Sequence, residues 1–254
     1  MTLGASASRA SMTTKTVAIL QSNYIPWKGY FDLINLVDEF VLYDDMQYTR
    51  RDWRNRNRIL TANGTRWLTI PVEVKGRYLQ RIRDTRVSDA GWADRHWQTL
   101  VHVYSRAPYF SMYAAQFEAL YRGLSTPWLS EINRRFLAEI CRILGITTRL
   151  TSSSEYELVE GRTQRLASIC SQAGGGHYVS GPAARDYIDP SVFANQDLEL
   201  SYIDYADYPV YPQLHEPFEH GVSILDLLFN AGPEAQRYMK SFAGSEAVVL
   251  QQAG

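Results

Sequence analysis

The stretch that decides the fold runs from Val17 to Arg58 and reads VAILQSNYIPWKGYFDLINLVDEFVLYDDMQYTRRDWRNRNR. It begins with a short apolar run, residues 17–20, which has the length of a buried strand. Pro26 suits the first position of a helix, and apolar residues then recur at helical spacing from Trp27 to Val37. A second short apolar run occupies residues 40–43. The order strand, loop, helix, strand predicts the first crossover of a parallel α/β sheet.

Two polar clusters, residues 21–28 and 44–58, follow these two predicted strands. In parallel α/β sheets, ligands bind outside the carboxyl ends of the strands. The second cluster interleaves arginines with Tyr48 and Trp53, and arginine forks beside aromatic faces suit a phosphate or carboxylate attached to a flat ring. A solvated surface loop is the alternative. We favour a ligand site, with substrate contacts expected from Gln21, Asn23, Tyr24, Trp27, Lys28, Tyr30, Asp44, Gln47, Arg51, Arg54, Asn55 and Arg56.

The rest of the chain predicts one large domain. Asn63-Gly64 between two apolar runs predicts a β-hairpin, and helical patterns fill the region that follows. Strands and helices then alternate again. We therefore expect a single α/β domain over residues 16–254, with a parallel sheet and a helical insertion at about 91–145. Residues 1–15 are rich in Ala, Ser and Thr and are expected to form a disordered tail.

Three further positions carry polar groups. Ser180 ends a predicted strand and precedes Gly-Pro at a predicted helix start, an arrangement that points backbone N–H groups at an anion. Ser180 and Arg185 would then contact a phosphate or carboxylate, although a helix start capped by the serine is an equal alternative. The basic segment Lys75–Arg86 favours a solvated face over a flap that closes on a phosphate. Asp226, on a predicted amphipathic helix, could be a buried acid, but we favour a surface position.

Composition limits the classes of function. The net charge of −1 provides no attraction to DNA or to an anionic membrane, and no segment approaches the roughly 20 apolar residues of a membrane span. Cys141 and Cys170 show neither disulfide nor metal spacing, so we expect a reducing, cytoplasmic compartment. P-loop, Gly-x-Gly-x-x-Gly, His-Glu-x-x-His and Gly-x-Ser-x-Gly motifs are absent. Asp44 and Asp45 could bind a divalent ion, but aspartates at strand ends as often bind substrate hydroxyls, and we assign no metal.

Three motifs of the opening stretch resemble those of the WbqC-like family. They are QSNYIPWKGYF at Gln21–Phe31, DDMQY at Asp44–Tyr48 and RDWRNRN at Arg51–Asn57. Ser22 departs from the family pattern, which more often has proline there. The resemblance covers nearly the whole chain after residue 15 and includes Trp67–Val72, His96 with Tyr104–Phe110, Tyr178–Tyr187 and Val222–Glu234.

This resemblance implies a transferase in the biosynthesis of surface polysaccharides (O-antigen, lipopolysaccharide) or of natural products. It implies the attachment of acyl or aminoacyl groups, glycyl for example, to amino sugars. We therefore expect a nucleotide-linked amino sugar as the acceptor. The donor co-substrate would be a carrier-protein thioester, a coenzyme A thioester or an aminoacyl-tRNA, with no tightly bound cofactor. An acyl-carrier protein or a tRNA is accordingly an expected partner, and the residues do not select one of them.

Such a transfer needs a base that removes a proton from the attacking amine. His96 falls on one predicted helix face with Leu100 and Tyr104, and the resemblance places a histidine here too. The unperturbed histidine pKa of about 6.5 suits a general base, and we expect Asp45 to assist it. A structural histidine is an equal alternative. A sugar-nucleotide-binding protein that serves another enzyme would need no catalytic base, and this function stays as the alternative.

A second resemblance is to the nucleotidyltransferase-like α/β superfamily, which has a Pro-x-His-x-Gly-His signature at the start of its first helix. Residues 26–30, Pro-Trp-Lys-Gly-Tyr, are similar in spacing with both histidines replaced. The resemblance supports a Rossmann-like, nucleotidyltransferase-like core, and Gly29 would let the helix approach a nucleotide closely. An adenylate-forming enzyme is a further alternative, disfavoured by the missing histidines.

Overall fold

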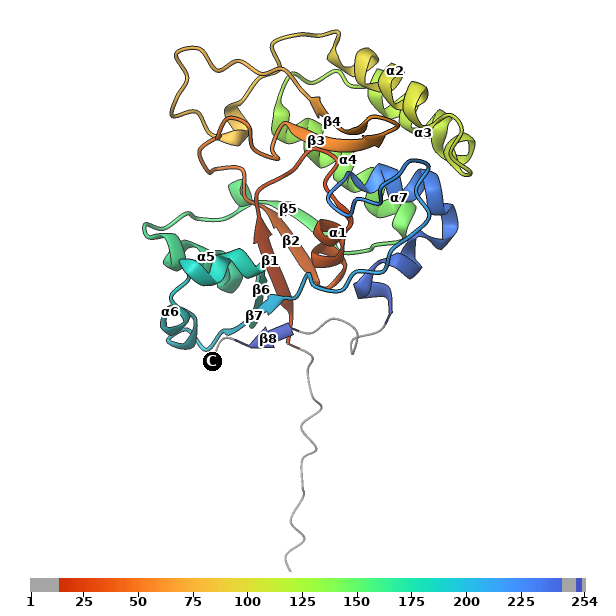
Figure 1. The fold of residues 1–254 in the computed structure, drawn as a ribbon. Helices are drawn as coiled ribbons and strands as arrows, with labels where there is room; N and C mark the ends of the chain where they lie inside the picture. Colours follow the sequence, from red (N-terminus) through yellow and green to blue (C-terminus); the bar gives the residue numbers. More distant parts are fainter. Residues whose placement is uncertain (1–13, 244–249, 253–254) are drawn as a thin grey trace, which may run out of the picture.

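A six-stranded sheet lies at the centre of this computed structural model, which describes residues 14–243 and 250–252 (Figure 1). The strands are ordered β5-β2-β1-β6-β7-β8; the first five are parallel, and β8 is antiparallel to β7. The predicted parallel, Rossmann-like α/β core is confirmed. Of the tail predicted at residues 1–15, residues 1–13 lie outside the described part of the chain. The strands are β1 (Thr16–Leu20), β2 (Glu39–Leu42), β5 (Arg149–Ser152), β6 (His177–Ser180), β7 (Glu199–Ile203) and β8 (Leu250–Gln252).

Helices cover both faces of the sheet, and the side chains of β1 alternate between them. Val17 and Ile19 belong to the core under α5 (Arg162–Gln172) and α6 (Pro190–Ala194). Ala18 belongs to the larger core under α1 and α7. This alternation follows from the two-residue period of a strand, and burial on both faces explains why the run is apolar throughout. The helices of the larger core are α1 (Lys28–Asn35) and α7 (Ile224–Ala231).

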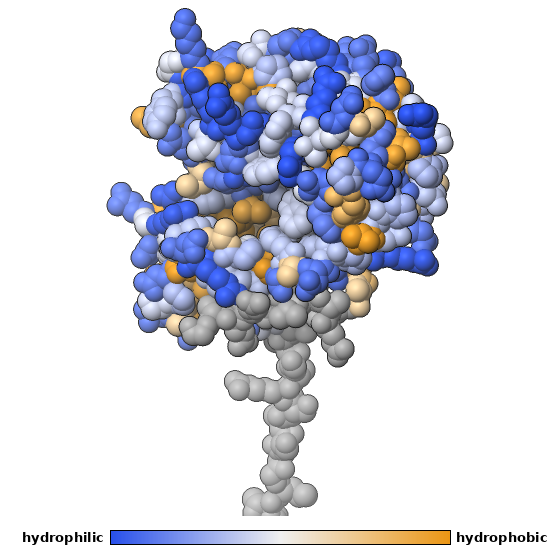
Figure 2. Space-filling model, in the orientation of Figure 1, coloured by the Kyte–Doolittle hydropathy of each residue, from blue (hydrophilic) through white to orange (hydrophobic). Residues whose placement is uncertain are grey.

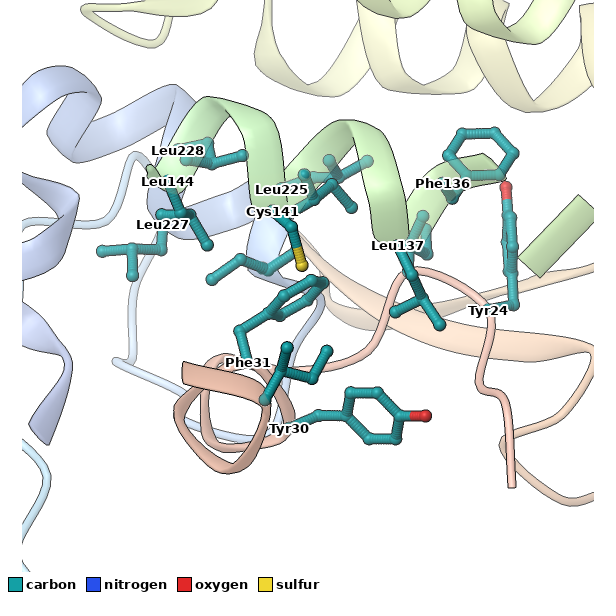
Figure 3. Packing of buried hydrophobic residues seen from close by; sticks show 14 of the residues in the cluster. Tyr24, Tyr30, Phe31, Phe136, Leu137, Cys141, Leu144, Leu225, Leu227 and Leu228 are labelled. Carbon is teal, nitrogen blue, oxygen red and sulfur yellow. The ribbon is translucent and has the colours of Figure 1, made fainter. Parts of the chain in front are cut away.

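A long insertion separates β2 from β5. It contains a β-hairpin whose turn has Gly64 at φ +91°, a conformation that favours glycine. Three helices follow, and α4 packs onto α1 and α7: Figure 3 shows Phe31 of α1 pointing toward Cys141 of α4, near Leu225 of α7. The insertion and the sheet therefore share one hydrophobic core. The elements of the insertion are β3 (Arg56–Thr61), β4 (Gly64–Thr69), α2 (Trp92–Tyr104), α3 (Phe110–Arg122) and α4 (Leu129–Leu144).

Asp226 on α7 is buried, which corrects the prediction of a surface position. Its carboxylate accepts hydrogen bonds from the hydroxyls of Tyr104 at 2.7 Å and Tyr211 at 2.9 Å. Burial raises the pKa of Asp226, and these hydrogen bonds oppose that shift. The carboxylate thus joins α2, α7 and the segment after β7. An amphipathic pattern would leave one face of α7 in solvent, whereas all eight of its residues are buried.

The strand order reverses between β1 and β6. From β1 the chain proceeds through β2 to β5, and α5 then returns it to the opposite side of β1, where β6 pairs with β1. Ligands of open α/β sheets bind at such a switch point, outside the carboxyl ends of the strands.

No helix within the described residues combines the length and the apolar character that a membrane span requires.

Candidate functional site

A buried aspartate, Asp44, holds the loop that follows β1 through hydrogen bonds. The Asp44 carboxylate accepts a hydrogen bond from the backbone N–H of Ser22 at 2.8 Å and another from the Ser130 hydroxyl. Asn133 of α4 donates to the Ser22 hydroxyl at 3.0 Å and to the backbone carbonyl of Arg54 at 2.9 Å. Asp44 is only 2% exposed, so it positions the loop and is not open to a substrate. Burial raises its pKa.

The arginine cluster packs against the same loop. Arg54 donates through a terminal guanidinium nitrogen to the side-chain oxygen of Asn23, and its Nε is buried without a hydrogen-bond partner. Asn55 is buried and donates to the carbonyl of Ile70 at 2.7 Å. The structure therefore brings the two predicted polar clusters together, with Arg54 and Asn55 as internal contacts between the loop and the base of the hairpin.

A cavity of about 310 Å³ lies where these segments meet. Trp53 and Arg58 from the arginine cluster face Asn23 and Trp27 from the loop after β1. Arg58 donates through Nε to the carbonyl of Gly221 at 3.0 Å, which joins the hairpin to the segment between β7 and α7. The complete lining is Asn23, Pro26, Trp27, Trp53, Asn57, Arg58, His220 and Gly221.

Arginines of β3 pack against two indole rings at the hairpin. The guanidinium carbon of Arg56 lies 4.0 Å from the centroid of Trp67, and that of Arg58 lies 5.8 Å from Trp53. The rings of Trp53 and Trp67 are 5.2 Å apart, and both residues are exposed. Arginine over an indole is a favourable pairing, and Trp53, beneath Arg58, lines the 310 Å³ cavity.

A smaller cavity of about 110 Å³ lies at the switch point of the sheet. Its lining includes Leu20 and Gln21 at the end of β1, Tyr43 after β2, Arg162 at the start of α5 and Tyr187 after β6. The guanidinium carbon of Arg162 is 3.3 Å from the centroid of the Tyr187 ring. In Figure 2 the surface is hollowed in this region, between α5 and the insertion, with hydrophobic residues at the bottom of the hollow.

The anion site predicted after β6 has a different backbone from the one expected. Residues Pro182–Asp186 form a short 3₁₀ helix, so no α-helix begins behind Ser180. The Ser180 side chain is buried and accepts a hydrogen bond from Tyr178 at 3.4 Å. Arg185 lies over the ring of Tyr202, with its guanidinium carbon 4.7 Å from the centroid. An anion site of the predicted kind needs the aligned N–H groups at the start of an α-helix. A single tight 3₁₀ turn stands in their place.

His96 has hydrogen-bond partners at both ring nitrogens. Nδ1 lies 2.9 Å from the Tyr24 hydroxyl and Nε2 lies 3.2 Å from the carbonyl oxygen of Thr69. The Tyr24 hydroxyl also bonds to Tyr121, and both Tyr24 and His96 are buried. Burial lowers the pKa of His96 to about 4. The ring is thus a neutral part of an internal network between the loop after β1 and the insertion.

The structure does not bring Asp45 to His96. The Asp45 carboxylate lies 2.8 Å from Arg83 and 3.5 Å from Arg81, and it accepts a hydrogen bond from Ser153 at 2.8 Å. No hydrogen bond or ion pair joins Asp45 and His96 in the described part of the chain. Asp45 therefore ties the insertion to the segment after β5.

The described residues contain no group of three or more His, Cys, Asp or Glu side chains placed to hold a metal ion.

The start of α1 is filled by side chains of the protein itself. A Cβ atom on Gly29 would lie 2.3 Å from the Trp27 indole, so the glycine makes room for this ring and not for a nucleotide. Lys28 is buried and donates to the Pro209 carbonyl at 2.8 Å. Burial lowers its pKa to about 8. Tyr30 is also buried and donates to the Gln21 carbonyl at 2.9 Å.

Gln47 and Arg51 lie away from both cavities described above. Gln47 is exposed and donates to the Tyr78 carbonyl at 2.8 Å, which links it to the basic segment 75–86. Arg51 is exposed, has a φ of +59°, and its carbonyl accepts a hydrogen bond from Arg56. Both residues therefore shape the arginine loop from outside.

Sequence reasoning missed His220 and Gly221, which line the larger cavity. They lie in an irregular segment after β7. A signal was available, because this segment follows the carboxyl end of a parallel strand, where ligands bind in such sheets.

Comparisons with known proteins agree with the motifs. The chain matches the model of the WbqC-like protein family over residues 21–238. It is 53% identical over 226 residues to Uncharacterized protein Rv1507c of Mycobacterium tuberculosis (strain ATCC 25618 / H37Rv), an alignment that covers 89% of this chain and 98% of the relative. No solved structure matches the chain. The resemblance drawn from the motifs is confirmed, and the chain belongs to the WbqC-like protein family.

Proposed function

We propose that the protein is a transferase that moves an acyl or aminoacyl group, such as glycyl, onto the amine of a nucleotide-linked amino sugar. The reaction would belong to the biosynthesis of a surface polysaccharide (O-antigen, lipopolysaccharide) or of a natural product. Membership of the WbqC-like family supports this proposal. The free, buried thiols of Cys141 and Cys170 are consistent with a cytoplasmic reaction.

The observation that carries the proposal is that one loop lines two cavities. Gln21 lines the 110 Å³ cavity at the switch point, and Asn23 lines the 310 Å³ cavity. Two residues of extended chain span at most about 7 Å, so one elongated ligand can contact both. The switch point is where α/β sheets bind nucleotides, and Arg162 there can pair with a phosphate. A phosphate of the nucleotide would occupy this cavity.

The 310 Å³ cavity suits an amino sugar. Trp27 and Trp53 offer indole faces against which the apolar face of a sugar ring can pack, while Asn23, Asn57 and Arg58 offer polar groups for its hydroxyls. The donor, a carrier-protein thioester, a coenzyme A thioester or an aminoacyl-tRNA, would present its carbonyl to the amine at the mouth of this cavity. Arg58 or backbone N–H groups would stabilise the oxyanion.

A sugar-nucleotide-binding protein without catalysis is the second candidate. The observation that favours it is the state of His96, whose two ring nitrogens are both occupied by protein groups. If His96 were the only available base, the site would bind a sugar nucleotide and do no chemistry.

Binding and turnover distinguish these functions. UDP-glucosamine should raise the melting temperature of the protein, because a ligand that binds only the native state stabilises it. Arg58→Ala should abolish the shift. Transfer is then measured with UDP-glucosamine and, in parallel, acetyl-coenzyme A, glycyl-tRNA and a glycyl-carrier-protein thioester. Stabilisation without turnover would support the binding protein, and stabilisation by ATP or coenzyme A alone would overturn both proposals.

A further inference from the structure

His220 is the histidine that lines the 310 Å³ cavity, beside Asn23, Trp27 and Arg58. It belongs to the segment between β7 and α7. The Phe218 ring packs edge-on against the imidazole, with ring centroids 4.5 Å apart. The orientation of the ring is therefore set by packing.

Neither ring nitrogen of His220 has a hydrogen-bond partner among the described residues, whereas both nitrogens of His96 do. The Nδ1 atom of His220 is also buried. Because the residue still lines the cavity, the open edge of its ring is the one that carries Nε2. In the neutral ring one nitrogen carries the proton and the other accepts. With the proton on Nδ1, the unpaired Nε2 is free to accept a proton from a bound substrate.

We propose that His220 is the proton acceptor for the amine of the amino sugar, acting through Nε2. This assignment rests on the proposed transferase function and deepens it. It names a catalytic base, a role that is open because both ring nitrogens of His96 are hydrogen-bonded within the protein. The site then has a base in direct contact with the cavity.

The proton and electron balance of the step is simple. The amine nitrogen forms a bond to the carbonyl carbon of the donor, and the carbonyl electron pair moves to oxygen. Nε2 of His220 takes the proton that the nitrogen must lose. The oxyanion then reforms the carbonyl as the bond to the leaving sulfur or ester oxygen breaks, and the imidazolium returns its proton to that leaving group.

The charges around His220 favour its neutral, proton-accepting form. Burial lowers the pKa of His220, the ammonium of Lys28 lowers it further, and Glu219 opposes this effect. Arg58 is a further charged group at this segment and donates to the carbonyl of Gly221. The ring is therefore neutral at pH 7, as a base must be before it acts.

The test compares His220→Gln with His96→Gln in the transfer assay, with UDP-glucosamine as acceptor and the three donors named above. His220→Gln should lower kcat by about 10²- to 10⁴-fold and leave the KM for UDP-glucosamine within about threefold, because the base acts in the transition state. His96→Gln should lower the melting temperature instead, with kcat of the folded fraction near that of the wild type.

A second variant keeps the assignment testable if His220→Gln folds poorly. Lys28→Met removes the charge that lowers the His220 pKa, so the acidic limb of the kcat/KM profile should move to higher pH. Full activity in His220→Gln, or an unmoved limb in Lys28→Met, would overturn the assignment and leave the proposed function standing. No turnover by the wild type with any donor would remove the proposed function and this assignment together.

Discussion

His96 and Asp44 are polar residues that the fold has taken out of solvent, and burial decides what each of them does. His96 is 8% exposed and Asp44 is 2% exposed. Each one has its polar atoms occupied by the protein, His96 by Tyr24 and Thr69, and Asp44 by Ser22 and Ser130. A residue in this condition contributes to stability and to the position of the loop after β1.

His96 should make the protein less stable in acid. Its pKa is about 4 in the folded state and about 6.5 in the unfolded chain. Between these pH values the unfolded chain binds more protons than the folded protein. The free energy of unfolding therefore decreases as the pH falls from 6.5 toward 4, and the decrease is about 3 kcal/mol at most. Urea unfolding at pH 7.5 and 4.5 measures it. The stability difference between wild type and His96→Gln should shrink at the lower pH, and an unchanged difference would refute this pKa.

Removing the Asp44 carboxylate should destabilise the protein. Asp44→Ala leaves the buried N–H of Ser22 without an acceptor, which costs about 2–3 kcal/mol. Ser130→Ala, the matched control, removes one donor from the same carboxylate and should cost about 1 kcal/mol. Chemical denaturation of the three proteins gives the comparison. Equal losses in the two variants would show that the Ser22 contact does not hold the loop.

The β3–β4 hairpin is the element that connects the arginine cluster to the 310 Å³ cavity. Arg58 on β3 reaches Gly221, where the absence of a side chain leaves room for the guanidinium group: a Cβ there would lie 2.3 Å from it. Trp53, at the base of the hairpin, lines the cavity, whereas Trp67 on β4 does not, although its ring is 5.2 Å from that of Trp53. The two indoles at the hairpin are therefore almost equally exposed, but only the Trp53 ring lines the cavity.

Trp53→Ala should weaken the binding of UDP-glucosamine by about tenfold, or about 1.4 kcal/mol, because it removes one ring from the cavity. Trp67→Ala is the matched control, since Trp67 is 41% exposed against 40% for Trp53 and does not line the cavity. Its affinity should stay within about threefold of the wild type. Isothermal titration calorimetry measures both. An equal loss in the two variants would mean that the sugar does not bind inside the 310 Å³ cavity.

In the whole molecule, the insertion and the sheet share one hydrophobic core. Phe31 of α1, Cys141 of α4 and Leu225 of α7 belong to the same buried cluster. Asp226 adds a polar link, because it binds Tyr104 of the insertion. Separating the insertion from the sheet would expose apolar surface on both parts.

Unfolding should therefore be one cooperative transition. Tryptophan fluorescence reports mainly on the insertion, while far-UV circular dichroism reports on the helices of both parts. The two signals should give the same urea midpoint, and separate midpoints would mean that the insertion unfolds by itself. Of the six tryptophans only Trp27 precedes β2, and those in the insertion are Trp53, Trp67, Trp92, Trp97 and Trp128.

The parts of the fold that the sequence predicted are those with a local cause. The crossover through β1, α1 and β2 follows from apolar periodicity within about 25 residues, and the hairpin follows from Asn63-Gly64. The all-buried helix α7 and the 3₁₀ turn after Ser180 were not foreseen. Their form depends on what packs against them, which no local pattern contains.

By itself, the sequence determined the parallel α/β core, the placement of two polar clusters at strand ends, and the family. Only the tertiary structure decided which polar side chains became internal contacts, such as Tyr24 and Asp44, and which line cavities, such as Asn23 and Trp53. It also brought His220 to the loop after β1 across nearly 200 residues. Helical and strand periods act between near neighbours in the chain, whereas burial and hydrogen-bond partners are set by contacts between segments that only folding brings together.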